Sequence, residues 1–247
     1  MKGKTIVIFG ATGGIGSELA NILTNRGCSV LLCSRNEEVL KELSLKLSQK
    51  YYVVDGAKEE DVESFFSQLS AQGQKIDGVV NCIGSFCIKP IQATSAKVWE
   101  EVMRVNLGSS FYILKQALKV MEAQKEGSIV LISSGAAKVG LAHHEAISAA
   151  KSGIEGLIRS AAASYAGSGI RINGIAPGLT KTPLSSSITQ NPEALKHSLK
   201  FHPLGRIGTP QDIAFSIAWL LSEESSWISG EILSVDGGLA HLKTNPL

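Results

Sequence analysis

The sequence predicts an α/β fold, in which a doubly wound parallel sheet of about seven strands carries helices on both faces. Three observations predict this fold. Short apolar runs recur along the chain, helix-length amphipathic stretches separate them, and a glycine-rich turn joins the first run to the first such stretch. Strands that alternate with helices form right-handed crossovers, and these crossovers make neighbouring strands parallel.

The apolar runs have the pattern of buried strands. They are short, rich in valine and isoleucine, and apolar on both faces, which is typical of a sheet covered by helices on both sides. In chain order, the predicted strands cover residues 5–9, 29–33, 51–54, 78–83, 128–133, 170–175 and 231–235.

The stretches between these runs have the spacing of amphipathic helices. Asn36 stands before two glutamates and Thr209 before a proline, and both patterns are typical of helix starts. Five of the seven prolines fall between residues 177 and 210, so we expect a broken, partly helical excursion over the strand ends at residues 178–208. The predicted helices cover residues 14–26, 37–49, 59–72, 96–123, 147–166 and 210–222.

Composition and charge exclude several classes of protein. The chain has 247 residues, 44% hydrophobic and 19% charged, which excludes a disordered chain and suits a single domain spanning residues 1–247. The net charge of +2 is spread along the sequence, so no nucleic-acid partner is expected. No apolar run approaches the length of a membrane span and no signal-peptide core precedes the first strand, so we expect a cytoplasmic protein without a membrane partner.

The four cysteines do not have the spacing of a metal or redox pair. Four residues separate Cys28 from Cys33, and four separate Cys82 from Cys87, whereas such pairs usually have two. We therefore expect small buried side chains that stay reduced, and no metal site.

A glycine-rich turn follows the first predicted strand directly and opens the first helix. Gly10 permits the sharp turn, Gly14 lets the backbone approach a phosphate without a Cβ, and Gly16 lets the helix pack close to the sheet. A pyrophosphate would then meet free N–H groups at the positive end of the helix dipole. The turn predicts a Rossmann-like dinucleotide site, with an ordinary tight turn as the alternative. Its predicted cofactor-binding residues are Gly10, Thr12, Gly13, Gly14, Ile15 and Gly16.

The end of the second strand reads the adenosine ribose in such sites. An acidic residue there would repel a 2′-phosphate, but this sequence has Ser34 and Arg35. A guanidinium can pair with a phosphate through two hydrogen bonds, so we predict NADP(H) over NAD(H). A solvated surface arginine is the alternative interpretation.

From Lys4 to Gly238, these motifs resemble the short-chain dehydrogenase/reductase family, near the 3-oxoacyl-acyl-carrier-protein reductases and bacterial carbonyl reductases. The glycine turn matches the family motif, although Phe9 stands where a threonine is common. The resemblance implies that Asp55 contacts adenine. It also assigns to the cofactor site a segment like the family's Asn-Asn-Ala-Gly and a Pro-Gly loop at the nicotinamide end. The residues concerned are Asn81, Gly84, Pro177, Gly178 and Thr182.

The resemblance further implies an active site with one departure. Asn106, Ser134 and Lys151 match the family's catalytic asparagine, serine and lysine. The family's tyrosine stands four residues before the lysine, and here that position is Ile147. The spacing from Ser134 to Ile147 fits the family without a gap, so the tyrosine is substituted.

This substitution removes the family's proton donor. In the family, the tyrosine protonates the alkoxide that forms when hydride adds to a carbonyl, and the lysine lowers its pKa and holds the nicotinamide ribose. The serine bonds the carbonyl oxygen, and the asparagine anchors a water. Losing a general acid typically slows a reaction ~10²–10⁴-fold.

Histidine could replace the missing donor, because it titrates near neutral pH. His143 and His144 lie just before Ile147, and His144 stands seven residues before Lys151, which resembles the tyrosine-to-lysine spacing of the enoyl-reductase branch. Loop histidines without a chemical role are the alternative.

Two further regions bear on partners. Residues 149–163 are rich in alanine and glycine, and in relatives this helix forms an intersubunit interface, so the resemblance implies a homodimer or homotetramer. Close packing within one subunit is the alternative. The resemblance implies that residues 182–207 form a substrate lid, and their apolar side chains favour a hydrophobic small-molecule substrate. Packing of these side chains onto the domain is the alternative.

The first functional hypothesis is an NADP(H)-dependent oxidoreductase that acts on a carbonyl or alcohol with a non-standard proton donor. A nucleotide-binding protein with little or no dehydrogenase activity, kept as a partner subunit or sensor, is the second. Non-redox chemistry in the same cleft, such as dehydration or cyclisation, is the third.

Overall fold

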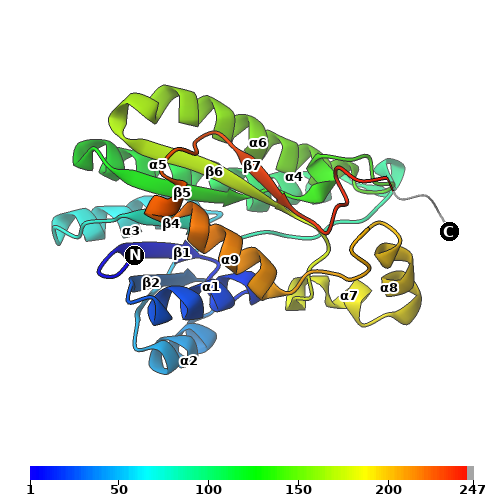
Figure 1. Ribbon diagram of the computed structural model, residues 1–247, viewed down its shortest axis with the longest axis horizontal. Coiled ribbons are helices and arrows are strands. Elements are labelled where there is room, and N and C mark those ends of the chain that lie inside the picture. The colour runs from blue at the N-terminus through cyan, green and yellow to red at the C-terminus, as the bar shows by residue number, and fades with distance from the viewer. Residues whose placement is uncertain (244–247) are drawn as a thin grey trace.

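One parallel sheet of seven strands runs through residues 1–243, which the computed structural model describes (Figure 1). The strand order is β3-β2-β1-β4-β5-β6-β7. The Rossmann-like α/β fold is therefore confirmed, and each predicted strand is present with ends within two residues of those expected. The strands are β1 (Thr5–Phe9), β2 (Ser29–Ser34), β3 (Lys50–Val53), β4 (Gly78–Asn81), β5 (Gly127–Ile132), β6 (Ile170–Pro177) and β7 (Ile232–Val235).

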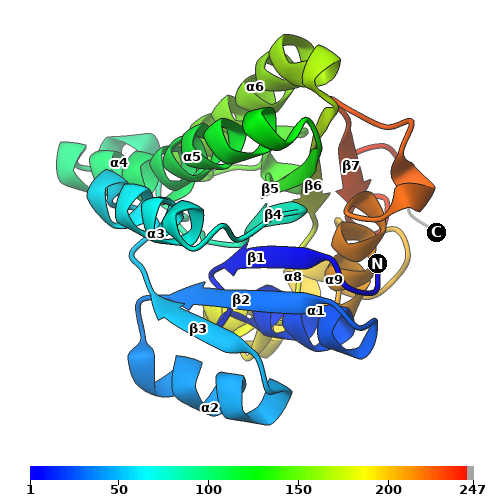
Figure 2. The same cartoon turned by 90° about the vertical axis from the view of Figure 1, so that its left-hand side faces the viewer.

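Helices cover both faces of the sheet (Figure 2). On one face, α1 (Gly14–Asn25), α2 (Glu37–Leu47) and α9 (Pro210–Leu220) bury their apolar sides against the strands. On the other face lie α3 (Glu59–Ala71), α4 (Ala96–Met103), α5 (Ser109–Gln124) and α6 (Glu145–Tyr165).

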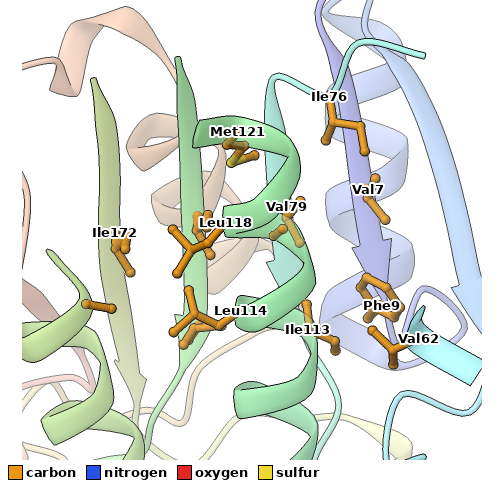
Figure 3. Close-up of a cluster of buried hydrophobic side chains, with 14 of the residues drawn as sticks. Val7, Phe9, Val62, Ile76, Val79, Ile113, Leu114, Leu118, Met121 and Ile172 are labelled. Atoms are coloured by element: carbon orange, nitrogen blue, oxygen red, sulfur yellow. The ribbon is translucent and has the colours of Figure 1, made fainter. Parts of the chain in front are cut away.

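The second of these faces holds the larger hydrophobic core. Figure 3 shows Val7 and Phe9 of β1 beside Val62 of α3 and Ile113 of α5. The Phe9 ring lies 5.6 Å from that of Phe65, edge to face. Such burial of aliphatic and aromatic side chains stabilises the sheet that carries the functional residues.

The prediction of a single helix over residues 96–123 is wrong, because the helix is interrupted. A π-helical segment, Arg104–Gly108, divides it into α4 and α5. The wider turn displaces backbone carbonyls, and side chains satisfy them: Asn106 Nδ2 donates to the carbonyl of Val102 (2.9 Å), and Ser110 Oγ donates to that of Asn106 (2.9 Å). Periodicity does not reveal this bulge, because one extra residue leaves the apolar pattern nearly unchanged.

After β6 the chain leaves the sheet and forms a broken, partly helical segment over the strand ends, as predicted (Figure 1, yellow). Its short helices are α7 (Ser186–Thr189) and α8 (Pro192–Leu199). Asn191 caps α8 by accepting hydrogen bonds from two backbone N–H groups, and Pro192 then begins the helix. Within residues 1–243, no helix combines the length and apolarity needed to cross a bilayer.

The strand order creates a crevice at the carboxyl ends of the central strands β1 and β4. The chain leaves β1 toward β2 on one side and returns to β4 on the other, so the connections diverge between β1 and β4. In open parallel sheets, ligands bind outside the carboxyl ends of the strands at such a point.

Candidate active site

A cleft of about 610 Å³ opens at the carboxyl ends of β4, β5 and β6. Its size suits a small-molecule site. Residues from the loop after β4 and from the lid segment make its walls largely apolar, among them Phe86, Ile88, Leu184, Ile188 and Phe201. The sequence-predicted residues that line it are Ile15, Gly84, Ser134, His143, His144, Ile147, Lys151, Pro177, Gly178 and Thr182.

The glycine turn between β1 and α1 is a backbone cradle. Gly10 has a φ of +75°, and a Cβ on it would lie 3.0 Å from the carbonyl carbon of Cys82. A Cβ on Gly14 would lie 2.8 Å from Thr182 Cγ2, and one on Gly16 would overlap the carbonyl oxygen of Gly10. The first N–H groups of α1 have no partner within the helix. The turn therefore fits the pyrophosphate of a dinucleotide.

The residues predicted for the adenosine end lie outside the cleft, along the ends of β2 and β3. Thr12 Oγ1 and Ser34 Oγ share a 2.7 Å hydrogen bond, which joins the glycine turn to the end of β2. Arg35 follows with an exposed side chain, and it forms no ion pair with any residue from 1 to 243. Asp55 accepts a hydrogen bond from the N–H of Ala57 (3.1 Å) through one carboxylate oxygen.

The Asn81 side chain is not placed to bind a cofactor directly. Its side chain is buried, and its amide donates to Ser109 Oγ (3.0 Å) and Ser110 Oγ (3.1 Å). Its oxygen accepts from the N–H of Ile83 (2.9 Å). Asn81 thus ties β4 to α5 and holds the backbone that leads to Gly84.

Lys151 reaches the cleft from α6 with a buried side chain. Its Nζ donates to the carbonyl oxygen of Ile132 at 2.8 Å. Burial lowers the pKa of Lys151 to about 8, because removal from water disfavours the ammonium ion. Because this pKa lies close to neutral pH, Lys151 can be present there as the ammonium ion or as the neutral amine. Burial also raises the pKa of the neighbouring Cys82 thiol to about 12, which keeps this sulfur neutral.

Ile147 lies one helical turn before Lys151 on the same face of α6 and is 4% exposed. It packs in a small apolar cluster with Val102, Ala146 and Ala150, and it also lines the cleft. An aliphatic side chain thus occupies the position at which the family resemblance implies a phenol.

Ser134 follows β5 and holds its side chain at the cleft. Its Oγ accepts a hydrogen bond from the N–H of Ala136 at 3.1 Å. Asn106 lies in the π-helical segment, is fully buried, and does not line the cleft itself. Instead its Nδ2 donates to Ser85 Oγ (2.8 Å), and its Oδ1 accepts from the N–H of Ser85 (3.2 Å).

Ser85 also lines the cleft, and it was not among the residues predicted from the sequence. The only sequence signal for Ser85 was that it directly follows Gly84, the last residue of the segment assigned to the cofactor site. In the structure, Gly84 lies close to the buried Lys151. A Cβ on Gly84 would lie 3.6 Å from Lys151 Nζ and 3.3 Å from Asn106 Oδ1. The contact between Ser85 and Asn106 spans 21 residues of sequence, so only the folded chain reveals it.

The histidines of the cleft differ in the hydrogen bonds that they make. His144 Nδ1 lies 2.8 Å from the carbonyl oxygen of Ala142, and because a carbonyl only accepts, Nδ1 carries the hydrogen and Nε2 is left free. His202 uses both ring nitrogens, since Nε2 accepts from the N–H of Leu179 (3.0 Å) and Nδ1 donates to the carbonyl of Ser198 (2.8 Å). His202 therefore braces the segment between β6 and α9, whereas His144 Nε2 makes no hydrogen bond with residues 1–243.

These side chains can bind and polarise a carbonyl group beside a dinucleotide. Ser134 offers a hydroxyl, Lys151 a cation and His144 an imidazole ring at one apolar cleft. Across residues 1–243, no group of three or more histidine, cysteine, aspartate or glutamate side chains is arranged to hold a metal ion.

Comparisons with known proteins agree with this geometry. The family model described as "Enoyl-(Acyl carrier protein) reductase" matches residues 10–240. The chain is 38% identical to "Short-chain dehydrogenase/reductase aba4" of Botryotinia fuckeliana (strain B05.10), over 95% of this chain and 96% of that one. It is 34% identical to 3-oxoacyl-[acyl-carrier-protein] reductase FabG of Chlamydia muridarum, over 96% and 97%. A structure of actinorhodin polyketide ketoreductase with NADPH matches with a TM-score of 0.92 at 27% identity, over 98% of this chain and 100% of that one.

Proposed function

The chain belongs to the short-chain dehydrogenase/reductase family, an oxidoreductase family, and on this basis we propose that it interconverts a hydrophobic carbonyl compound and its alcohol with NADP(H). One observation carries the proposal. The fold brings Ser134, His144 and the buried Lys151 to one apolar cleft that Ile147 and the start of α1 also line.

The preference for NADP(H) rests on Arg35. This arginine is exposed at the end of β2, and the hydrogen bond between Ser34 and Thr12 joins that strand end to the cradle. A free guanidinium at this position suits a 2′-phosphate on the adenosine ribose. The ketoreductase neighbour that was solved with NADPH supports the same preference.

Each residue of the cleft has a separate role in the proposed carbonyl reduction. NADPH, when bound, supplies the hydride that adds to the carbonyl carbon. Ser134 donates a hydrogen bond to the carbonyl oxygen of the substrate. Lys151 binds the nicotinamide ribose through its ammonium group. The imidazolium of His144 gives the alkoxide its proton from Nε2, because Nδ1 is held by the carbonyl of Ala142.

The lid and the outer helices support the remaining parts of the proposal. Segment 182–207 covers the cleft with apolar side chains such as Leu184 and Phe201, which suits a hydrophobic substrate. Trp99 on α4 and Phe111 on α5 are large exposed apolar side chains, which suits burial in a homodimer or homotetramer.

An activity assay with three proteins tests the function. The natural chain should oxidise NADPH with hydrophobic ketones or reduce NADP⁺ with the matching alcohols. A His143→Ala/His144→Ala variant should lose ~10²–10⁴-fold in kcat, because a general acid is removed. Ile147→Tyr should retain or raise the rate. If the natural chain is inactive with every substrate and Ile147→Tyr is active, the nucleotide-binding alternative is correct instead.

A further inference from the structure

A phenol at position 147 would serve a substrate oxygen in two ways, by hydrogen bonding to it and by protonating it. Ile147 can do neither, so the hydroxyl that a phenol would offer at this position is absent. We propose that Ser85 supplies the missing hydrogen bond, so that Ser85 and Ser134 together hold the substrate oxygen and stabilise the alkoxide. This inference rests on the proposed carbonyl chemistry.

The position of Ser85 suits this role. It lines the same cleft as Ser134, Ile147 and Lys151. Its neighbour Gly84 passes so close to the lysine that a Cβ there would lie 3.6 Å from Nζ. Ser85 therefore lines the cleft directly after the residue that approaches the cation, and a cation stabilises negative charge on a substrate oxygen.

The hydrogen bonds of Ser85 fix its side chain and leave its hydrogen free. Asn106 Nδ2 donates to Ser85 Oγ at 2.8 Å, and the N–H of Ser85 donates back to Asn106 Oδ1 at 3.2 Å. Asn106 cannot move away, because it is fully buried and its Nδ2 also donates to the carbonyl of Val102 at 2.9 Å. Among residues 1–243, no acceptor takes a hydrogen bond from Ser85 Oγ, so its O–H is available to donate.

Ser134 has the same arrangement. Its Oγ accepts from the N–H of Ala136 at 3.1 Å, which again leaves the O–H to donate. Two other serines of the cleft, Ser133 and Ser185, donate their hydroxyl hydrogens to the protein. Ser133 donates to Glu155 Oε1 at 2.9 Å, and Ser185 donates to the carbonyl of Thr180. Ser85 and Ser134 thus form a pair of pre-oriented donors, one from each of the two neighbouring strand ends, β4 and β5.

Substituting Ser85 tests the inference. Ser85→Ala should lower kcat ~10²–10³-fold, the usual cost of removing one donor to a developing oxyanion. NADPH affinity and the shape of the pH–rate profile should stay as in the natural chain, since the hydroxyl neither binds cofactor nor titrates. Ser85→Thr, which keeps a hydroxyl, should recover much of the rate. Ser164→Ala, at an exposed site near the far end of α6, is the matched control and should have no effect.

Each other outcome overturns the inference in a recognisable way. If Ser85→Ala folds, binds NADPH and keeps kcat within about threefold of the natural chain, the hydroxyl does not contact the oxyanion. Should that variant fail to fold, Ser85→Cys decides, because a thiol is of similar size but a weak donor: an unchanged kcat contradicts the inference and a large loss supports it. A natural chain that turns over no carbonyl or alcohol contradicts the proposed function, and Ser85 then has no oxyanion to bind.

Discussion

Arg35 is the single residue on which the proposed cofactor preference depends. Arg35→Ala should weaken NADPH binding ~10–100-fold and leave NADH binding unchanged, because only the 2′-phosphate loses a charge-assisted hydrogen bond. Protein fluorescence titrations with both cofactors measure the two affinities. Arg26→Ala, an exposed arginine beyond the end of α1, is the control and should change neither. Tighter binding of NADH than NADPH by the natural chain would contradict the assignment.

At the scale of residues, the sequence predicted which residue types belong to the site and how they are spaced, but not which groups their side chains bond to. Ser134, Ile147 and Lys151 were predicted as a group, and the structure places all three at one cleft. Asn81 and Asn106 were also predicted, yet their side chains are bonded to serines distant in sequence. The place of Ser85 directly after Gly84 was its only sequence signal, because its contact with Asn106 forms only when the loop after β4 and the π-helical segment meet.

Among the elements, the junction of β1 and α1 can be tested through Gly14. Gly14→Ala should weaken NADPH binding about tenfold or more, because its Cβ would enter the phosphate cradle and press on Thr182 Cγ2, 2.8 Å away. Thermal unfolding should change little, since Thr182 lies on a lid loop that can shift. Gly167→Ala, whose Cβ would meet nothing within 4 Å, is the control. Unchanged NADPH affinity in Gly14→Ala would show that the turn does not hold the cofactor.

Strands and most helices were predictable because their apolar periodicity reflects burial directly. The strand of residues 5–9 and the helix that begins at Pro210 were predicted at the correct start. The division of residues 96–123 was not, because the π-helical segment depends on side-chain bonds from Asn106 and Ser110 to backbone carbonyls. Hydrophobic periodicity does not report such bonds.

For the whole molecule, an ion-pair network at the amino ends of the strands, opposite the cleft, should contribute to acid sensitivity. Hydrogen bonds from Lys4 and Lys75 lower the pKa of Glu126 from 4.5 to about 2. Because the folded pKa is the lower one, the network stabilises the fold above about pH 4.5 and loses that effect as the pH falls toward 2. Glu126 is half exposed, so solvent limits the contribution to less than about 1 kcal/mol.

Urea unfolding of Glu126→Gln measures this contribution. The variant should have a lower free energy of unfolding than the natural chain at pH 7, and the difference should shrink as the pH is lowered toward 2. Glu63→Gln, which removes a more distant surface pair with Lys119 (3.7 Å), should show a smaller difference at pH 7. A difference for Glu126→Gln that grows in acid would have the wrong sign and contradict the assigned cause.

The sequence alone determined the strands, most of the helices and the glycine-rich turn, because these follow from local pattern. The ribose role of Arg35 and the replacement of a tyrosine by Ile147 stay predictions that spacing and family resemblance imply. Only the tertiary structure decided which side chains share the cleft and which are bonded elsewhere. The reason is that a hydrogen bond such as the one from Asn106 to Ser85 joins separate elements, so its existence depends on how α4, α5 and β4 pack together. The same packing buries Lys151 and lowers its pKa, which no short stretch of sequence encodes.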